Sequence, residues 1–359
     1  MNARTLAAVA FCLVAAGATD TPAQSSAARK GITDVQGIRV GHHTLSDRPT
    51  GCTVILADGQ GAVGGVSQRG GAPGTVETNL LDPSNLVERV NAVFLSGGSA
   101  FGLDVKTGVS RYLEERRTGY AVGAAGVVPI VTGAILFDLG FGGDSKIRPG
   151  ADCGYRAATA ATDGPVQEGN IGAGAGATVG KMGGRGRRPM KAGVGSASIV
   201  LESGLIVGAV VAVNAVGDIV DPMTGRVVAG TRNSDGTLAD ARRVLREAQA
   251  PSIPGPLQNT TIAIVATNAR LTKAQAHRMA IMADDGLARA IVPSHTMSDG
   301  DTVFALATGR YEGQVNMTVI GALAAEMLSE AIIRAATRAT TSGGLPAARD
   351  LGTVPERFK

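Results

Sequence analysis

The residues with the clearest chemical potential are Asn259, Thr260 and Thr261, which follow the proline-rich stretch 251–256 and begin an apolar run. A threonine hydroxyl is a weak nucleophile and needs a nearby base. If the bond between Asn259 and Thr260 were cut, Thr260 would gain a free α-amino group. The ordinary pKa of that group is about 7.7–8.0, so it can act as the base near neutral pH. Taken alone, the same tripeptide is an ordinary start of a strand, because β-branched residues favour strands.

Other motifs that could carry chemistry fail on their spacing. Gly180-Lys181 resembles the end of a phosphate-binding loop, but Met182 stands where a magnesium-holding Ser or Thr is needed. The stretch 172–177 fits a loose dinucleotide-binding pattern without the strand–helix unit which that pattern requires. Ser99 lacks the following glycine of a nucleophile elbow. The four histidines show no metal-binding spacing, so we expect no metal site and no cofactor.

Composition excludes one class of partner. The chain has 359 residues with 34 Lys and Arg against 30 Asp and Glu, a formal net charge of +4, and only 3% aromatic residues. This small charge excess, with few rings for base stacking, argues against nucleic-acid binding. Hydrophobic residues make up 44% and charged residues 18%, which is typical of a folded chain with an ample core.

The N-terminus, Met1 to about Ala23, has the pattern of a secretory signal peptide. Arg4 precedes the apolar run 6–16, and small residues follow. The run has eleven residues, whereas a membrane span needs about 20. We therefore expect export to the periplasm or the extracellular space, with an uncleaved amphipathic arm as the alternative.

Cysteine usage leaves two possibilities open. Cys12 lies within the predicted signal, so Cys52 and Cys153 remain in the mature chain. They can form one disulfide in an oxidising compartment or stay as two buried thiols.

Strands and helices are predicted in a mixed order. Short apolar runs predict strands at 53–56, 92–95, 198–201, 205–213, 261–266 and 302–307. A turn at 202–204 joins the third and fourth runs into a hairpin. Helices are expected over 102–116, after a capping box at 272–275, and over the alanine-rich stretch 314–336. The glycine-rich and basic stretch 167–195 is expected to be an irregular loop. This mixture favours α+β layering over a doubly wound sheet.

Several sequence blocks together resemble one enzyme family. In chain order they read GITDV, IRVGH, VFLSGGSAFGL, VNAVGD, NTTI, ADDGLARA and DGDTVF, from Gly31 to Phe304. The chain resembles the L-aminopeptidase/D-alanine-esterase/amidase and β-peptidyl aminopeptidase family, above all its threonine branch of 6-aminohexanoate-oligomer hydrolases. The resemblance extends to about Ala336.

The resemblance implies an αββα sandwich like that of N-terminal-nucleophile hydrolases, with a different strand connectivity. It implies a single self-processing domain over 31–359, cut into an α chain that ends at Asn259 and a β chain of 100 residues that starts at Thr260. Thr260 would then be the nucleophile of both self-cleavage and substrate hydrolysis. The family also implies a homotetramer.

By the same resemblance, Asp299 and Asp301 match an acidic pair that holds the nucleophile and its amine. Asn214 and Lys181 match residues that line the site, and the asparagine amide is suited to stabilise an oxyanion. Each has a plainer alternative: a surface turn for the Asp-Gly-Asp stretch, a solvated cation for Lys181, and a strand cap for Asn214. Phe137 stands where the family often has an aromatic hydroxyl.

We therefore expect a hydrolase of aminopeptidase, amidase or esterase type, acting on peptides or amino-amide oligomers with a free amino end. Its expected partners are that small substrate and further copies of the chain, with no nucleic acid and no membrane span. Two alternatives stay open. One is an uncleaved relative with esterase activity. The other is an exported binding protein that keeps the scaffold without turnover, against which the intact Asn259-Thr260 junction argues.

Overall fold

The computed structural model describes residues 30–182, 186–247 and 259–359. The predicted signal peptide, 1–23, and the proline-rich stretch 251–256 lie outside these residues. Within them, no helix is both long and apolar enough to cross a membrane.

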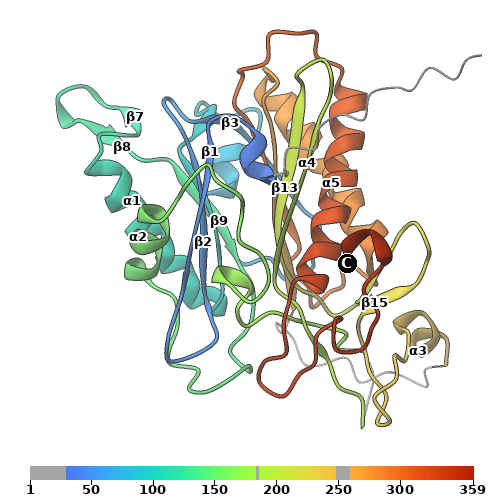
Figure 1. The fold of residues 1–359 in the computed structure, drawn as a ribbon. Coiled ribbons are helices and arrows are strands. Elements are labelled where there is room, and N and C mark those ends of the chain that lie inside the picture. The colour runs from blue at the N-terminus through green and yellow to red at the C-terminus, as the bar shows by residue number, and fades with distance from the viewer. Residues whose placement is uncertain (1–29, 183–185, 248–258) are drawn as a thin grey trace, which may run out of the picture.

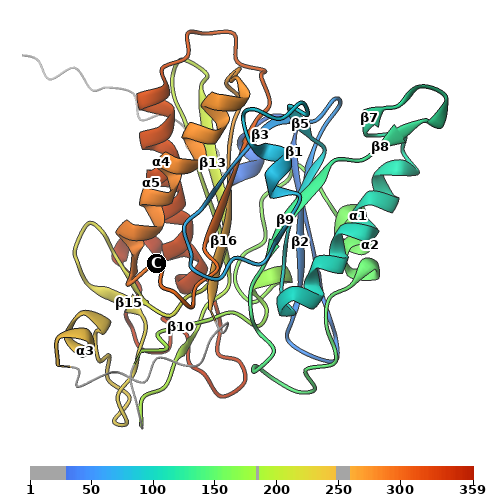
Figure 2. The ribbon, with the colours of Figure 1, turned by 180° about the vertical axis from the view of Figure 1, so that it is seen from behind.

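Two β-sheets face each other, and each carries a pair of helices on its outer side (Figures 1 and 2). In spatial order the first sheet contains β1 (Ile38–Thr44), β2 (Gly51–Ala57), β6 (Ala92–Ser96), β9 (Val131–Ile135) and β4 (Thr75–Val76). The second contains β12 (Val194–Val200), β13 (Ile206–Asn214), β16 (Thr260–Thr267), β18 (Thr302–Ala307), β3 (Ala62–Gln68) and β5 (Arg89–Val90). The outer helices are α1 (Val105–Glu114) and α2 (Ala151–Thr159) on the first sheet, and α4 (Lys273–Ala290) and α5 (Met317–Thr337) on the second.

Smaller elements complete the described chain. The remaining strands are β7 (Tyr120–Ala121), β8 (Val127–Val128), β10 (Thr178–Val179), β11 (Met190–Lys191), β14 (Asp218–Val220), β15 (Val227–Ala229) and β17 (Ile291–Val292). A short helix α3 spans Ala241–Glu247, and 3-10 turns occur at Ile32–Asp34, Thr78–Leu81, Ser99–Asp104, Gly123–Ala125, Gly172–Gly174 and Glu356–Phe358. The layer order is helix, sheet, sheet, helix, so the predicted αββα sandwich is confirmed.

The core lies in the three spaces between these layers. Ile264 of β16 packs between the two sheets with Leu95 and Phe304, whereas its neighbour Val265 packs toward the outer helices with Met279. Each such large side chain contributes about 1.5–3 kcal/mol when fully buried. The strand β16 is thus buried on both faces, which is why its sequence is a continuous apolar run.

Local patterns predicted several of these elements well. The run 302–307 coincides with β18, and the capping box at Thr272 and Gln275 begins α4 as expected. The helix expected from residue 314 begins at Met317, because the side chain of Asn316 accepts the first free N–H groups.

The expectation of an irregular basic loop over 167–195 is partly wrong. Strand β12 already begins at Val194, and the short β10–β11 pair lies within the stretch. Lys191 is fully buried, and its ammonium donates to the carbonyls of Gly174 at 3.0 Å and Ala177 at 2.9 Å. Those carbonyls replace water around the ammonium group, and these hydrogen bonds stabilise the interior of the loop.

A disulfide joins Cys52 of β2 to Cys153 of α2 across a sequence separation of 101 residues. Of the two possibilities left open by the sequence, the structure therefore has the disulfide. It ties an outer helix to the first sheet.

Replacing both cysteines by serine should lower the free energy of unfolding by about 2–5 kcal/mol, because the unfolded chain loses a long cross-link. Thermal unfolding of the purified protein measures this. Reductant should lower the wild-type midpoint and leave the variant unchanged. Equal midpoints for oxidised wild type and variant would show that the bond does not stabilise the fold.

Candidate active site

Strand β16 begins at Thr260 and has a candidate site residue on each side. In the antiparallel ladder, Thr260 pairs with Asn214, the last residue of β13. On the other side, Asn259 forms a parallel bridge with Asp299, just before β18. All four residues have exposed fractions of 3% or less. Segments far apart in the sequence thus meet at one buried junction.

The hydroxyl of Thr260 lies against the peptide bond that precedes it. It donates to the carbonyl oxygen of Asn259, and that oxygen also accepts the backbone N–H of Gly300 at 3.3 Å. A Cβ atom at Gly300 would lie 2.9 Å from Thr260 Oγ1 and 2.7 Å from the carbonyl oxygen of Ala72, so only glycine fits without displacing them. The hydroxyl and the carbonyl that an acyl shift at this bond would join are thus in contact.

The two aspartates hold different parts of this junction. Asp301 accepts the N–H of Thr261 at 2.8 Å and, through its other oxygen, the N–H of His295 at 2.9 Å. Asp299 accepts the N–H of Thr296 at 3.1 Å and its hydroxyl at 2.6 Å. Both carboxylates are buried. The Asp-Gly-Asp stretch is therefore a buried clamp on the start of β16 and not a surface turn.

Two groups near the junction titrate close to neutral pH. Burial raises the pKa of Asp299 to about 6, and the nearby charge of Asp301 adds to the effect. Burial lowers the pKa of the Lys181 ammonium to about 7, against the charges of Asp299 and Asp138. Groups with such pKa values can take up and release protons under working conditions, as acid–base chemistry needs.

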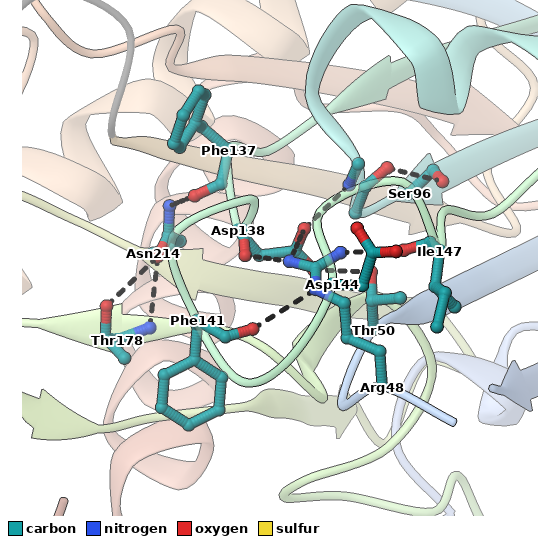
Figure 3. Close-up of polar contacts among 12 residues, drawn as sticks. Arg48, Thr50, Ser96, Phe137, Asp138, Phe141, Asp144, Ile147, Thr178 and Asn214 are labelled. Carbon is teal, nitrogen blue, oxygen red and sulfur yellow. Dashed lines mark hydrogen bonds and ion pairs between the residues drawn. The ribbon is translucent and has the colours of Figure 1, made fainter. Parts of the chain in front are cut away.

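Lys181 is bound to Asn214 and is not a freely solvated loop cation. Its ammonium donates to Asn214 Oδ1 at 2.8 Å, and the N–H of Thr178 donates to the same oxygen at 3.1 Å. The Asn214 amide group in turn donates to the backbone carbonyl of Phe137 at 2.8 Å (Figure 3). Phe137 thus adjoins the site, and its ring carries no hydroxyl. The orientation of the Asn214 amide is fixed from both ends.

A cavity of about 770 Å³ opens beside Asn214 and Lys181. One wall is the loop 137–142, which a buried arginine fixes in place. Arg48 lies 3.1 Å from Asp138 Oδ1 and donates to the backbone carbonyls of Phe141 at 3.2 Å and Ile147 at 3.0 Å (Figure 3). Arg48 and Asp138 are both buried, so this ion pair makes a rigid wall for the cavity.

Sequence reasoning did not single out His295, which lies beside Asp301, or Asp284, which lies beyond His295. His295 Nδ1 lies 3.0 Å from Asp301 Oδ2, and its Nε2 lies 3.9 Å from buried Asp284. Burial alone would lower the pKa of His295, but the hydrogen bond and charge of Asp301 and the charge of Asp284 raise it overall. His295 belongs to no motif with a recognisable spacing. The block ADDGLARA, which contains Asp284, was the only signal in the sequence.

The paired sheets, the outer helices and a candidate nucleophile at the start of a central strand define an N-terminal-nucleophile hydrolase fold. The chain belongs to peptidase family S58, whose family model matches residues 30–349. It is a hydrolase of the aminopeptidase and amidase type.

Relatives and solved structures agree with this assignment. The chain is 44% identical over 345 residues to an uncharacterized aminopeptidase of Mycobacterium leprae, covering 88% of this chain and 92% of that protein. It is 33% identical over 322 residues to a 6-aminohexanoate-oligomer endohydrolase of Kocuria sp., covering 84% of this chain and 85% of that protein. The solved β-aminopeptidase of a Burkholderia sp. matches with a TM-score of 0.68 at 26% identity, over 90% and 93% of the two chains. The L-aminopeptidase D-Ala-esterase/amidase of Ochrobactrum anthropi shares the fold, with a TM-score of 0.67 at 20% identity over 91% and 95%.

If the chain cleaves itself between Asn259 and Thr260, as the sequence resemblance implies, replacing Thr296 by valine should move the acid limb of that reaction, expected near pH 6, upward by about one pH unit. The variant loses the hydroxyl that stabilises ionised Asp299, so the pKa of that carboxyl rises further. A hydrogen bond to a charged group contributes about 1.5 kcal/mol, and one pH unit corresponds to about 1.36 kcal/mol. Chain splitting, followed by gel between pH 4.5 and 8, measures the limb. If the pH at which splitting slows stayed the same in the variant, ionisation of Asp299 would not control the acid side of the pH profile.

Replacing His295 by glutamine should slow the self-cleavage that the resemblance implies about 10- to 100-fold, because small misplacement of reacting groups has effects of that size. Asp301 would lose the imidazole beside it and hold the start of β16 less firmly. His43→Gln is the matched control, since His43 lies on β1 of the other sheet. The same time course of splitting serves both variants. Equal rates for His295→Gln and wild type would show that His295 does not contribute to self-cleavage.

Proposed function

We propose that this protein is a self-cleaving hydrolase with Thr260 as N-terminal nucleophile, acting on amide bonds of peptides or amino-amide oligomers. The observation that carries the proposal is the contact of the Thr260 hydroxyl with the carbonyl of Asn259, which also accepts the N–H of Gly300. Family membership supports the hydrolase class.

In maturation, Thr260 Oγ1 attacks the carbonyl carbon of Asn259 and the peptide C–N bond breaks. The hydroxyl proton passes to the departing nitrogen of Thr260, which leaves an ester between the two residues. Water then hydrolyses the ester, which frees the Asn259 carboxylate and restores the hydroxyl. The product is a chain that begins at Thr260 with a free amine.

In turnover, the new amine of Thr260 takes the hydroxyl proton and Oγ1 attacks the substrate carbonyl. The amine product leaves, and water releases the acid from the acyl-enzyme. Asp299 and Asp301 hold the amine and the start of β16, while Asn214 and Lys181 face the developing oxyanion. Asp299, Asp301 and Asn214 are buried around the junction and Lys181 binds Asn214, which supports these proposed roles.

We also propose that the enzyme works outside the cytoplasm. Disulfides persist in oxidising compartments, so the bond between Cys52 and Cys153 supports the export that the N-terminal segment predicts.

Replacing Thr260 by alanine should leave one uncut chain without amidase activity, whereas serine at this position should still cleave, because it keeps a hydroxyl nucleophile. Intact mass and release of p-nitroaniline from 6-aminohexanoyl-p-nitroanilide and its uncharged and acidic analogues measure the two steps. Thr261→Val is the matched control: its hydroxyl has no hydrogen-bond partner among the described residues, and its backbone N–H to Asp301 remains. A Thr260→Ala protein that splits or hydrolyses amides would contradict the proposal.

A further inference from the structure

The cavity beside Asn214 and Lys181 has a charge pattern that bears on the substrate. It holds about 770 Å³ and is walled by apolar side chains at several points: Phe137, Leu139, Phe141, Met182 and Leu345. These walls suit a hydrocarbon chain. The inference rests on the proposed function, because it takes this cavity as the place where the substrate of Thr260 binds.

Among the described residues that line the cavity, no carboxylate is placed to bind a positively charged substrate group directly. Asp138 is the single acidic residue among its described lining residues. One oxygen of Asp138 lies 3.1 Å from Arg48 and accepts the N–H of Gly98 at 2.9 Å. The other accepts the hydroxyl of Thr50 at 2.5 Å. The Asp138 side chain is fully buried and already binds Arg48, Gly98 and Thr50, so it is poorly placed to bind a substrate ammonium group directly (Figure 3).

Two basic side chains line the same cavity. Lys181 is bound to Asn214 at the end next to Thr260. Arg187 is half-buried on the wall, and it forms no ion pair with any carboxylate of the described residues. An ammonium group placed here would lose water and meet the like charge of Arg187, which is unfavourable. A carboxylate would meet the planar guanidinium of Arg187, which binds such groups well.

We propose that the cavity binds a substrate segment that is a hydrocarbon chain, either neutral or ending in a carboxylate, and that it disfavours one ending in an ammonium group. The sequence resemblance led us to expect a free amino end. The cavity instead favours amides that lie within an oligomer or near its acid end. Arg187 sets this preference.

Two matched series of compounds test the proposal with the self-cleaved wild-type enzyme. On the acyl side they are the p-nitroanilides of adipic acid (as the monoanilide), hexanoic acid and 6-aminohexanoic acid, which differ only in the terminal group. On the amine side they are hexanoyl amides of 4-aminobutyrate, butylamine and 1,4-diaminobutane, followed by chromatography. The series that shows the preference identifies which side of the scissile bond the cavity holds.

In whichever of the two series places its terminal group in the cavity, kcat/KM should be at least about tenfold higher for the carboxylate compound than for the ammonium compound. The neutral compound should lie between them. Arg187→Gln should reduce this ratio to about threefold or less, mainly through KM. Arg188→Gln, which removes the same charge from the adjacent exposed residue outside the cavity lining, should leave the ratio unchanged.

The proposal is overturned if the ammonium compounds are hydrolysed as well or better in both series, if the cleaved enzyme hydrolyses no member, or if Arg187→Gln keeps the ratio. Failure of the proposed function would be distinguishable. In that case intact mass of the same preparation would show a single uncut chain.

Discussion

The parallel pairing of β16 with β18 is the constraint on which the whole site depends. It sets Asn259 beside Asp299 and allows Asp301 to accept the N–H of Thr261. Because side chains alternate along a strand, a slip of one residue would turn Thr260 to the opposite face. Apolar packing on both faces of β16 prevents such a slip. The fold therefore fixes the position of one hydroxyl relative to one carbonyl, and the surrounding carboxylates and amides follow from the same register.

Sequence reasoning found the features that local patterns encode. The run that became β18, the capping box at Thr272 and the junction at Thr260 are all visible over a few residues. It missed contacts between distant residues. Arg48 meets Asp138 across 90 residues, and nothing near either one indicates that both will be buried. For the same reason the sequence predicts only an irregular basic loop around Lys191: the carbonyls that surround its ammonium come together only when the layers pack.

The relatives differ, by their names, in the kind of amide bond they cleave: an aminopeptidase removes residues from an amino end, and an endohydrolase cuts within an oligomer. The two cases place opposite demands on a binding cavity, because an amino end brings a cation and an internal bond does not. In this chain the sole acidic residue described in the cavity wall is occupied by Arg48 and Thr50, and Arg187 faces it without a carboxylate partner in the described chain. On the proposal made above, the charges in this cavity would distinguish between activities that the shared fold permits equally.

The central claim is that Thr260 becomes a chain terminus and the nucleophile. Intact-mass spectrometry with N-terminal sequencing of the purified wild-type protein tests it most directly. The account predicts two chains, of which the smaller has 100 residues and begins with Thr260. A single chain that stays whole on long incubation, or a cut at another bond, would contradict it, because Thr260 would then have no free amine to act as its base.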